Sequence, residues 1–393
     1  MASLNSAQYV VVIIPNLALS TLKVCLQVLP PATFAVLGAN GTFRTNSFDA
    51  GFNPTNTSPP FFQIFDERFA TVLGPAASIT QIAANATFAF AHEAPIYDPL
   101  QDAVFFASND GGELGMSDLE HNNKVGMIHL KDLPALDELN GTAIEIPLNL
   151  PNTLQMTNGG TGPFRGNLLF INSGRGALPP SVALVNPRPP HNATILLDNY
   201  YGRQFNSLND IKIHPSGKLF FTDNVAGYLH NFRPLPGMPN QVYRLDPETR
   251  AVRVVATDFN KSNGIAFDGA GRTAYITDTG ASGGFLGNNQ TLQATIYAFD
   301  VDPHTQMFMN RRVFAYTDAG IPDGVQVDLE GNVYGSCVDG VHVWSPDGAL
   351  IGKFFLGMGS SNLVFAGRGR LIILAETKIF LARIAASPSL FTS

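Results

Sequence analysis

Charged side chains are scarce in this sequence of 393 residues. Asp, Glu, Lys and Arg make up only 14% of it, and the formal net charge of −7 is spread along the chain without acidic or basic blocks. A surface that binds nucleic acid needs clustered Lys and Arg. We therefore exclude nucleic acid as a partner.

Long apolar runs are also missing, although 45% of the residues are hydrophobic. The most apolar stretch, residues 9–29, is interrupted by Pro15, and no Lys or Arg precedes it. No run reaches the length of about 18 residues that a membrane-spanning helix needs. We expect no membrane span, and we interpret residues 1–60 as an N-terminal segment with a candidate signal peptide and an arm.

Cysteine is nearly absent, with only Cys25 and Cys337. These are either two buried thiols or one disulfide that ties an N-terminal arm to the body. The sequence has a high density of N-x-[ST] glycosylation sequons for a cytosolic protein, which favours a secretory route, an oxidising compartment and a secreted glycoprotein. The sequons begin at Asn40, Asn56, Asn85, Asn140, Asn192, Asn260 and Asn289.

Few segments have the 3.6-residue period of a helix, whereas short strands separated by turns recur. From Ile265 the chain reads IAFD, GAGR, TAYITDT, a Gly/Asn-rich excursion, TIYAFDVD and RRVFAYTD. Residues 211–257 and 325–355 repeat this series of four strands with similar turns. Self-similarity at roughly 40–60 residues, with four strands in each unit, is typical of a β-propeller.

Counting the repeats gives six units. They begin near Glu93, near Gly166, at Asn209, at Asn263, at Asp323 and at Asn362. The last unit shows three strands, and we expect residues 61–74 to supply the fourth, which closes the ring and protects the edges. We predict an all-β fold, a six-bladed β-propeller of four-stranded blades with N-/C-terminal ring closure, as one domain over residues 61–393. Stacked β-sandwiches would not explain the shared phase of the units.

Side chains with oxygen atoms stand where the units begin. Because the first strand of a propeller blade lines the central channel, these side chains are expected to converge on the axis. Oxygen ligands without Cys or His are typical of a hard divalent cation such as Ca²⁺, with Mg²⁺, Mn²⁺ or Zn²⁺ as alternatives. Taken singly, each of these residues can equally cap a turn. The expected metal ligands are Glu93, Asn209, Asn263 and Asp323.

The repeats resemble the SMP-30/gluconolactonase family, and its secreted fungal lactonase branch most of all. The motifs that carry the resemblance are FNSLNDIKIHPSGKLFFTD, SNGIAFDGAGRTAYITDTG, IPDGVQVDLEGNVYGSCVDGVHVW and SSNLVFAG, and the likeness extends from about Glu93 to Ile384. It implies a six-bladed propeller with a catalytic divalent metal, usually Ca²⁺, on those four ligands. It also implies a disulfide between Cys25 and Cys337. The family's FTDP-x-YG is replaced by FTDNVAG, so the substrate is not carried over.

Candidate catalytic and substrate-binding residues surround the same unit starts. The resemblance implies Asp323 as the base, and Asp210 is either an alternative base or a part of the metal's shell. His92 adjoins Glu93, but neighbours in an extended strand point to opposite sides, so it either touches substrate or packs behind the site. The expected substrate-binding residues are Asn209, Asn362, Tyr97, Asn109 and Asn172.

Three functions fit this pattern. The first is a metal-dependent hydrolase of a lactone or related ester, in which the metal polarises the carbonyl and activates water. The second is a cyclase or cycloaddition enzyme of fungal secondary metabolism on the same propeller, without net hydrolysis. The third is a binding propeller without activity, which the intact ligand set disfavours. The partner is a small-molecule substrate, and the sequence does not distinguish a monomer from a homodimer.

Overall fold

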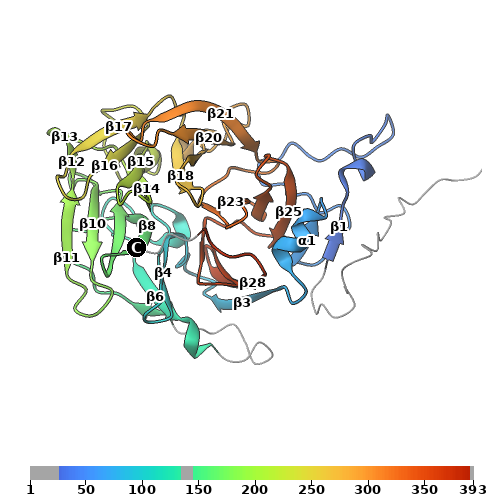
Figure 1. Ribbon diagram of the computed structural model, residues 1–393, viewed down its shortest axis with the longest axis horizontal. Coiled ribbons are helices and arrows are strands. Elements are labelled where there is room, and N and C mark those ends of the chain that lie inside the picture. The colour runs from blue at the N-terminus through green and yellow to red at the C-terminus, as the bar shows by residue number, and fades with distance from the viewer. Residues whose placement is uncertain (1–25, 134–144, 390–393) are drawn as a thin grey trace, which may run out of the picture.

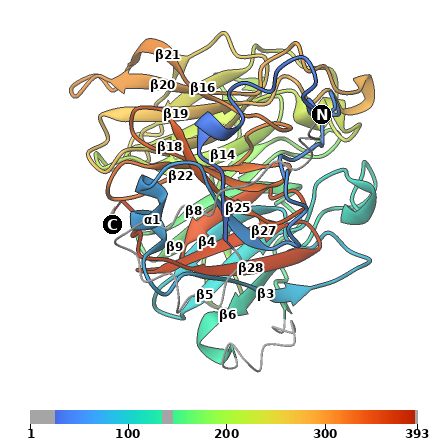
Figure 2. The ribbon, with the colours of Figure 1, turned by 90° about the vertical axis from the view of Figure 1, so that its right-hand side faces the viewer.

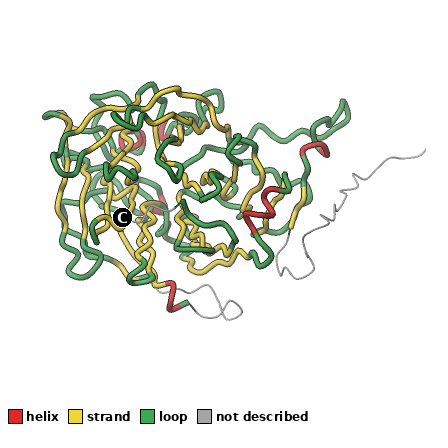
Figure 3. The backbone as a smooth tube through the Cα atoms, in the orientation of Figure 1, coloured by secondary structure: helices red, strands yellow, loops and turns green. Residues whose placement is uncertain are grey.

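The computed structural model describes residues 26–133 and 145–389, and it is nearly all β within that part. Six sheets surround a common centre (Figure 1), and the few helices are short (Figure 3). The longest of these helices, α1, spans Arg68–Leu73, and α2 spans Ala226–Leu229. The short 3₁₀ helices are η2 (Pro31–Thr33), η3 (Glu113–Gly115), η4 (Leu130–Asp132) and η5 (Gly284–Leu286).

Each sheet is an antiparallel meander whose first strand lies nearest the axis. Blade 1 contains β4 to β7 (Glu93–Asp98, Ala103–Ala107, Val125–His129, Ile146–Pro147). Blade 2 contains β8 to β11 (Thr157–Phe164, Asn167–Asn172, Ser181–Val185, Ala193–Leu197). Blade 3 contains β14 to β17 (Leu208–Ile213, Leu219–Asp223, Gln241–Leu245, Val252–Ala256). Blades 4 and 5 are β18 to β21 (Ser262–Phe267, Thr273–Asp278, Thr295–Val301, Phe308–Tyr316) and β22 to β25 (Val325–Val327, Val333–Cys337, Gly340–Trp344, Leu350–Phe355). Blade 6 contains β26 to β28 (Asn362–Phe365, Arg370–Ala375, Lys378–Arg383). A separate hairpin joins β12 (Asn199–Tyr200) to β13 (Arg203–Gln204).

The six inner strands contact one another in sequence, and β26 contacts β4, so the ring is closed. Aromatic side chains fill the spaces between blades. For example, Phe220 of blade 3 stacks on Phe308 of blade 4 with ring centroids 5.5 Å apart. The predicted six-bladed β-propeller is therefore confirmed.

The closing strand is not the one that the sequence suggested. The fourth strand of blade 6 is β3 (Ser78–Ala84), which pairs antiparallel with β28 (Figure 2). Residues 61–74 instead form β2 (Phe61–Ile64) and α1, and β2 adds a fifth strand to blade 5 beside β25. All four side chains of β2 are buried, and Phe61 stacks on Phe355 with centroids 4.7 Å apart. This packing fixes β2 on blade 5, and β1 (Leu26–Val28) pairs parallel with its outer edge.

The start of the second unit is also corrected. The segment near Gly166 is the second strand, β9, and the inner strand is β8. Its sequence, TNGGTGPF, contains three glycines and a proline, which are depleted in strands. The local strand propensity therefore did not predict β8. This shift makes Asn158 the head residue of blade 2, where the head residue is the oxygen-bearing residue at the start of the inner strand.

Glycosylation, a disulfide and export stay predictions. Asn40, Asn56, Asn192, Asn260 and Asn289 are exposed, as glycosylation requires, whereas Asn140 lies outside the described residues. Cys337 is buried, and Cys25 lies outside the described residues, so the disulfide stays a prediction. None of the helices in the described part is long and apolar enough for a membrane span.

Candidate active site

Four inner strands carry the same irregularity at the end where the ligands were predicted. In β4, β8, β14 and β18 the register shifts between the first and the fourth residue, as in a β-bulge. A bulge breaks the regular alternation and re-aims side chains. In β4 it includes Ala94 at φ 54°. In β8, β14 and β18 the first residue inside the bulge is an asparagine (Asn158, Asn209 and Asn263), whereas in β4 it is Ala94 and Glu93 precedes it.

Glycine follows three of the head residues because the next inner strand leaves no room for a side chain. A Cβ at Gly264 would lie 2.6 Å from the carbonyl oxygen of Asp323. At Gly159 it would meet the carbonyl oxygen of Asn209, and at Gly324 the side-chain oxygen of Asn362. The Asn263-Gly264 pair near the start of β18 is therefore explained by the close approach of the neighbouring blade and does not form a hairpin turn.

Buried aspartates at the ends of the second strands hold the loops that enter the inner strands. Asp223 accepts hydrogen bonds from the backbone N–H groups of Asn206 and Ser207, 3.1 and 2.8 Å away. Asp278 accepts two equivalent bonds from Asn260 and Lys261, of 2.9 and 2.8 Å. Burial raises the pKa of Asp223 to about 7, against the lowering effect of these N–H donors. These hydrogen bonds fix the positions at which Asn209 and Asn263 enter the channel.

Three of the head side chains keep a buried oxygen without a hydrogen-bond partner. They are Oδ1 of Asn158, Oδ1 of Asn209 and Oδ1 of Asp323. A buried polar atom without a partner normally lowers the free energy of unfolding by about 1–3 kcal/mol, so three such atoms at the starts of inner strands indicate a site where a ligand binds. Asn263 hydrogen-bonds the Asp323 carboxylate, which only partly offsets the rise in the pKa of that acid caused by burial.

Two carboxylates, the buried Glu93 and the partly buried Asp323, face each other within this group. Ligand atoms of Glu93, Asp323 and His92 all lie within 4.8 Å of one another. Burial raises the pKa of Glu93 well above its usual value, and the charge of Asp323 raises it further. Burial also raises the pKa of Asp323, to about 6, despite the opposing charge of His92. A divalent cation would relieve this repulsion and occupy the unpartnered oxygens, so the residues fit the predicted metal.

His92 lies inside the group and is held by an acid from another blade. Its Nδ1 is 2.6 Å from Oε1 of Glu376, and its Nε2 is 3.9 Å from Oε1 of Glu93. Asn109 donates to the second oxygen of Glu376 over 2.9 Å. A carboxylate only accepts, so Nδ1 carries a proton. Burial lowers the pKa of His92, but the charges of Glu376 and Glu93 outweigh it and raise this pKa well above its usual value, so the ring is charged when no cation is bound. His92 lies at a bend one residue before β4, so the alternation expected for an extended strand does not apply to it.

A second set of titratable groups lies beside the first. Asp110 accepts a hydrogen bond of 2.8 Å from the amide of Asn158, and its carbonyl oxygen lies 3.2 Å from Nδ1 of His230. Burial raises the pKa of Asp110 and lowers that of His230. Burial also lowers the pKa of Lys261 to about 8, although the charge of Asp323 opposes this. This side of the channel therefore offers proton donors and acceptors as well as oxygen ligands.

Loops of four blades contact one another on this side. The N–H of Gly176 donates to the carbonyl of Phe232 over 2.8 Å, and Tyr228 packs edge-on against Phe285 at 5.4 Å. Large apolar side chains on these loops remain exposed. They are Leu114, Met116, Leu119, Leu178, Leu235, Phe285 and Leu286. The loops thus form a partly apolar wall at the mouth of the site.

The structure places other predicted residues nearby in supporting roles. Asn362 donates to Oε2 of Glu93 over 2.7 Å and so orients that carboxylate. Asp210 is buried, and its two oxygens accept backbone N–H bonds of 2.8 Å from Ile211 and 3.1 Å from Ile265. These bonds tie β14 to β18. Asp210 therefore lies behind the head residues with its oxygens already used by the backbone.

Two predicted substrate-binding residues are not brought to this group. Tyr97 is hydrogen-bonded to Asp102 and Arg370, each over 3.0 Å, at the other end of the channel. Asn172 is fully buried inside blade 2, where it accepts from the hydroxyl of Thr157 over 2.9 Å. We therefore assign Asn172 to a structural position and Tyr97 to the wall of a cavity at that other end.

Asn158 and Glu376 were missed from the sequence. Asn158 follows the same pattern as the other heads, because TNGG matches SNGI in phase, but its glycine-rich strand was not recognised. Glu376 stands in the turn between β27 and β28 and carries no local motif, so only the closed ring brings it to His92.

Comparison with known proteins now assigns the chain. A family model described as "SMP-30/Gluconolactonase/LRE-like region" matches residues 93–375. The chain belongs to the SMP-30/gluconolactonase/LRE-like family. The match begins at Glu93 and ends one residue before Glu376, so it spans all six blade heads.

Relatives within and around this family are distant in sequence. The lactonohydrolase oryL of Aspergillus oryzae is 28% identical over 317 residues, which are 75% of this chain and 67% of the relative. The structure of a gluconolactonase from Xanthomonas campestris shares 23% identity and a TM-score of 0.63 over 82% of this chain and 93% of that one. A calcium-binding regucalcin from Agrobacterium tumefaciens shares 16% and a TM-score of 0.56 over 79% and 95%. The two structures show that the fold is shared.

Proposed function

We propose that this protein is a metal-dependent hydrolase of a lactone or related ester. The observation that carries the proposal is the convergence of buried, unpartnered oxygens with two facing carboxylates at the heads of the inner strands. Family membership and the likeness to a fungal lactonohydrolase support the reaction class. The relatives described above offer no support for the cyclisation alternative.

The residues suited to hold the cation are Glu93, Asn209, Asn263 and Asp323, with Asn158 as an additional oxygen donor. All are oxygen donors, which favours Ca²⁺ over a softer ion. Bound there, the cation supplies Lewis-acid polarisation of the lactone carbonyl. Asn362 keeps the Glu93 carboxylate in place through its bond to Oε2.

His92 is the best-placed proton acceptor for the attacking water. Asp323 would be a weak base as a metal ligand, because a bound cation stabilises its ionised form. A cation held by Glu93 and Asp323 would offset their charges and favour the neutral ring of His92, which then presents Nε2 to the group while Glu376 holds the Nδ1 proton. We therefore assign proton transfer to His92 and a positioning role to Glu376. Lys261, buried and electrostatically coupled to Asp323, adds positive charge on the side where the carbonyl oxygen becomes negative.

The proposed function is tested by titrating acid release from a panel of lactones with and without an apolar substituent. Hydrolysis should disappear with EDTA and return with Ca²⁺, and the same experiment ranks Mg²⁺, Mn²⁺ and Zn²⁺. Glu93→Gln should abolish turnover, whereas Glu67→Gln, at an exposed carboxylate outside the ring, should leave it unchanged. Turnover that survives both EDTA and Glu93→Gln would refute the proposal.

A further inference from the structure

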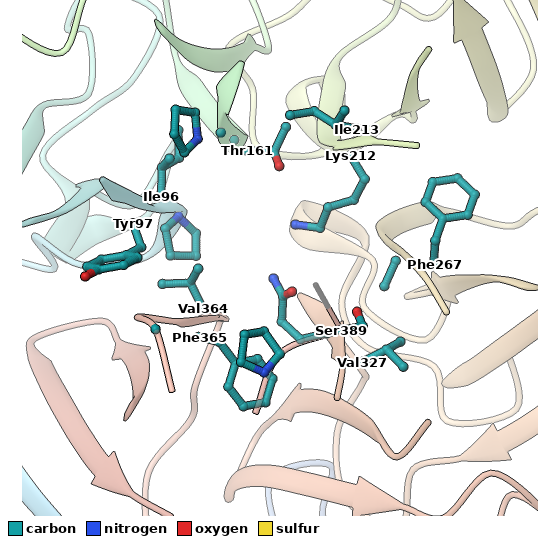
Figure 4. A pocket seen from close by; sticks show the side chains of 18 of the residues that line it. Ile96, Tyr97, Thr161, Lys212, Ile213, Phe267, Val327, Val364, Phe365 and Ser389 are labelled. Carbon is teal, nitrogen blue, oxygen red and sulfur yellow. The ribbon is translucent and has the colours of Figure 1, made fainter. Parts of the chain in front are cut away.

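One cavity lies away from the heads of the inner strands. It has a volume of about 370 Å³ and is lined by residues three to four positions further along the same strands, among them Ile96, Lys212 and Phe267 (Figure 4). At about 3.3 Å per residue, this is roughly 10 Å down the channel. The cavity therefore faces the opposite mouth of the propeller from the candidate active site.

Lys212 extends into this cavity (Figure 4). Its side chain is 14% exposed, and the nearest carboxylate oxygen, Oδ2 of Asp210, is 3.9 Å from Nζ. That distance is too long for a hydrogen bond. Among the described residues, the ammonium group donates no hydrogen bond, so three N–H donors are available to a ligand.

The rest of the cavity is mainly apolar. Ile96, Val364 and Phe365 contribute aliphatic and aromatic walls from blades 1 and 6, and Phe267 closes the side toward blade 4. A cavity of this size, with one charged group among apolar walls, is typical of a site for a small organic ligand. The single ammonium fixes the polar end of that ligand, and the walls accommodate its body.

The charge balance selects the polar group. The Asp210 carboxylate, 3.9 Å from the ammonium, already offsets part of its charge and would repel further anions, so the cavity favours a ligand with one negative charge over a ligand with two. Among the residues that line the cavity, no arginine offers the paired donors that favour phosphate. We propose that this cavity binds organic monocarboxylates that carry an apolar body, with Lys212 as the carboxylate's partner. The inference is independent of the proposed hydrolysis.

The test is titration of the purified full chain with 4-phenylbutyrate by calorimetry, with saturation-transfer NMR to show ligand contact. Neutral 4-phenylbutanol and inorganic phosphate are the comparison ligands. We expect measurable binding of 4-phenylbutyrate alone. Lys212→Met should weaken it about tenfold to a hundredfold, because a charge-assisted hydrogen bond is lost. Lys212→Arg should largely retain it.

Two further variants separate this cavity from the active site and from folding defects. Glu93→Gln should bind 4-phenylbutyrate as the wild type does, whereas Val364→Phe, which fills the cavity and keeps Lys212, should lose binding. Equal affinity for the acid and the alcohol, or binding that is unchanged in both Lys212→Met and Val364→Phe, would overturn the inference. So would an absence of binding to the wild type.

Discussion

Nδ1 of His92 lies 2.6 Å from Oε1 of Glu376, although 284 residues separate them in the chain. His92 precedes the inner strand of blade 1, and Glu376 lies in the turn between β27 and β28 of blade 6. The pair therefore forms only when the ring is closed. It places a residue suited to proton transfer beside the predicted metal ligands and gives that residue a fixed tautomer.

The first prediction concerns this pair. Glu376→Gln should lower kcat/KM for lactone hydrolysis about 10- to 100-fold, as is typical when a partner of an active-site residue is lost. The loss should fall mainly on kcat, since Glu376 positions His92 and does not bind the metal. Calcium affinity, measured by calorimetry, should therefore remain close to that of the wild type. A large loss of calcium binding with little loss of kcat would instead make Glu376 a metal ligand.

The second prediction compares two buried asparagines of blade 2. Asn158→Ala removes a side chain with a free oxygen at the channel, so kcat/KM should fall about tenfold, a loss of about 1.4 kcal/mol in transition-state stabilisation. Asn172→Ala leaves the hydroxyl of Thr157 without its acceptor and should lower the free energy of unfolding by about 1–3 kcal/mol. Turnover per folded molecule should stay normal in Asn172→Ala. If instead Asn172→Ala abolishes turnover and Asn158→Ala does not, the assignment of the two roles is wrong.

The third prediction follows from the position of Tyr97. Tyr97→Phe removes hydrogen bonds with Asp102 and Arg370 but leaves the ring in place. We expect a loss of about 1 kcal/mol in the free energy of unfolding and unchanged kcat and KM for lactones. Steady-state kinetics on the panel of lactones checks this, and a raised KM would restore Tyr97 to the substrate site.

The fourth prediction uses a buried charge cluster in blade 5. Nζ of Lys353, fully buried, lies 2.7 Å from Asp318 and 3.0 Å from Asp339. Burial raises the pKa of Asp339, but the charges of His342 and Lys353 outweigh it and hold this pKa well below its usual value. The stabilisation is therefore complete above the unfolded-state pKa of about 3.9 and is lost as the pH falls below it.

Lys353→Met should then lower the free energy of unfolding by about 3–5 kcal/mol at neutral pH, because two carboxylates remain buried without their partner. The difference from the wild type should shrink as the pH falls below about 4, because the unfolded chain then binds protons that the folded wild-type carboxylates do not yet bind. Urea denaturation at several pH values measures both effects. Lys218→Met is the matched control, since its pair with Asp246 is more exposed and should be worth less than about 1 kcal/mol. An equal loss in both variants, independent of pH, would contradict this account.

The sequence predicted the propeller because its strands repeat with constant phase, and it predicted the heads Glu93, Asn209, Asn263 and Asp323 for the same reason. It misplaced the closing strand, since residues 61–64 and β3 have similar apolar content and only packing on blade 5 or blade 6 distinguishes them. Such a choice depends on tertiary contacts that local propensity does not encode.

Other parts of the site could not be predicted from the sequence, for physical reasons. The alternation rule does not apply to His92, because this residue lies at a bend just before β4, and nothing in the local sequence predicts that bend. Glu376 has no motif, and its role depends on a partner at the far end of the chain. Tyr97 was assigned to the active site by proximity to Glu93, but four residues along an inner strand carry a side chain to the other end of the channel.

The most direct test of the central claim is a crystal structure of the protein grown with Ca²⁺, combined with metal analysis of the same preparation. The account predicts one cation per chain on the axis, coordinated by oxygens of Glu93, Asn209, Asn263 and Asp323, and its loss in Asp323→Asn. A channel without an ion at these residues, in protein that still hydrolyses lactones after chelation, would contradict it.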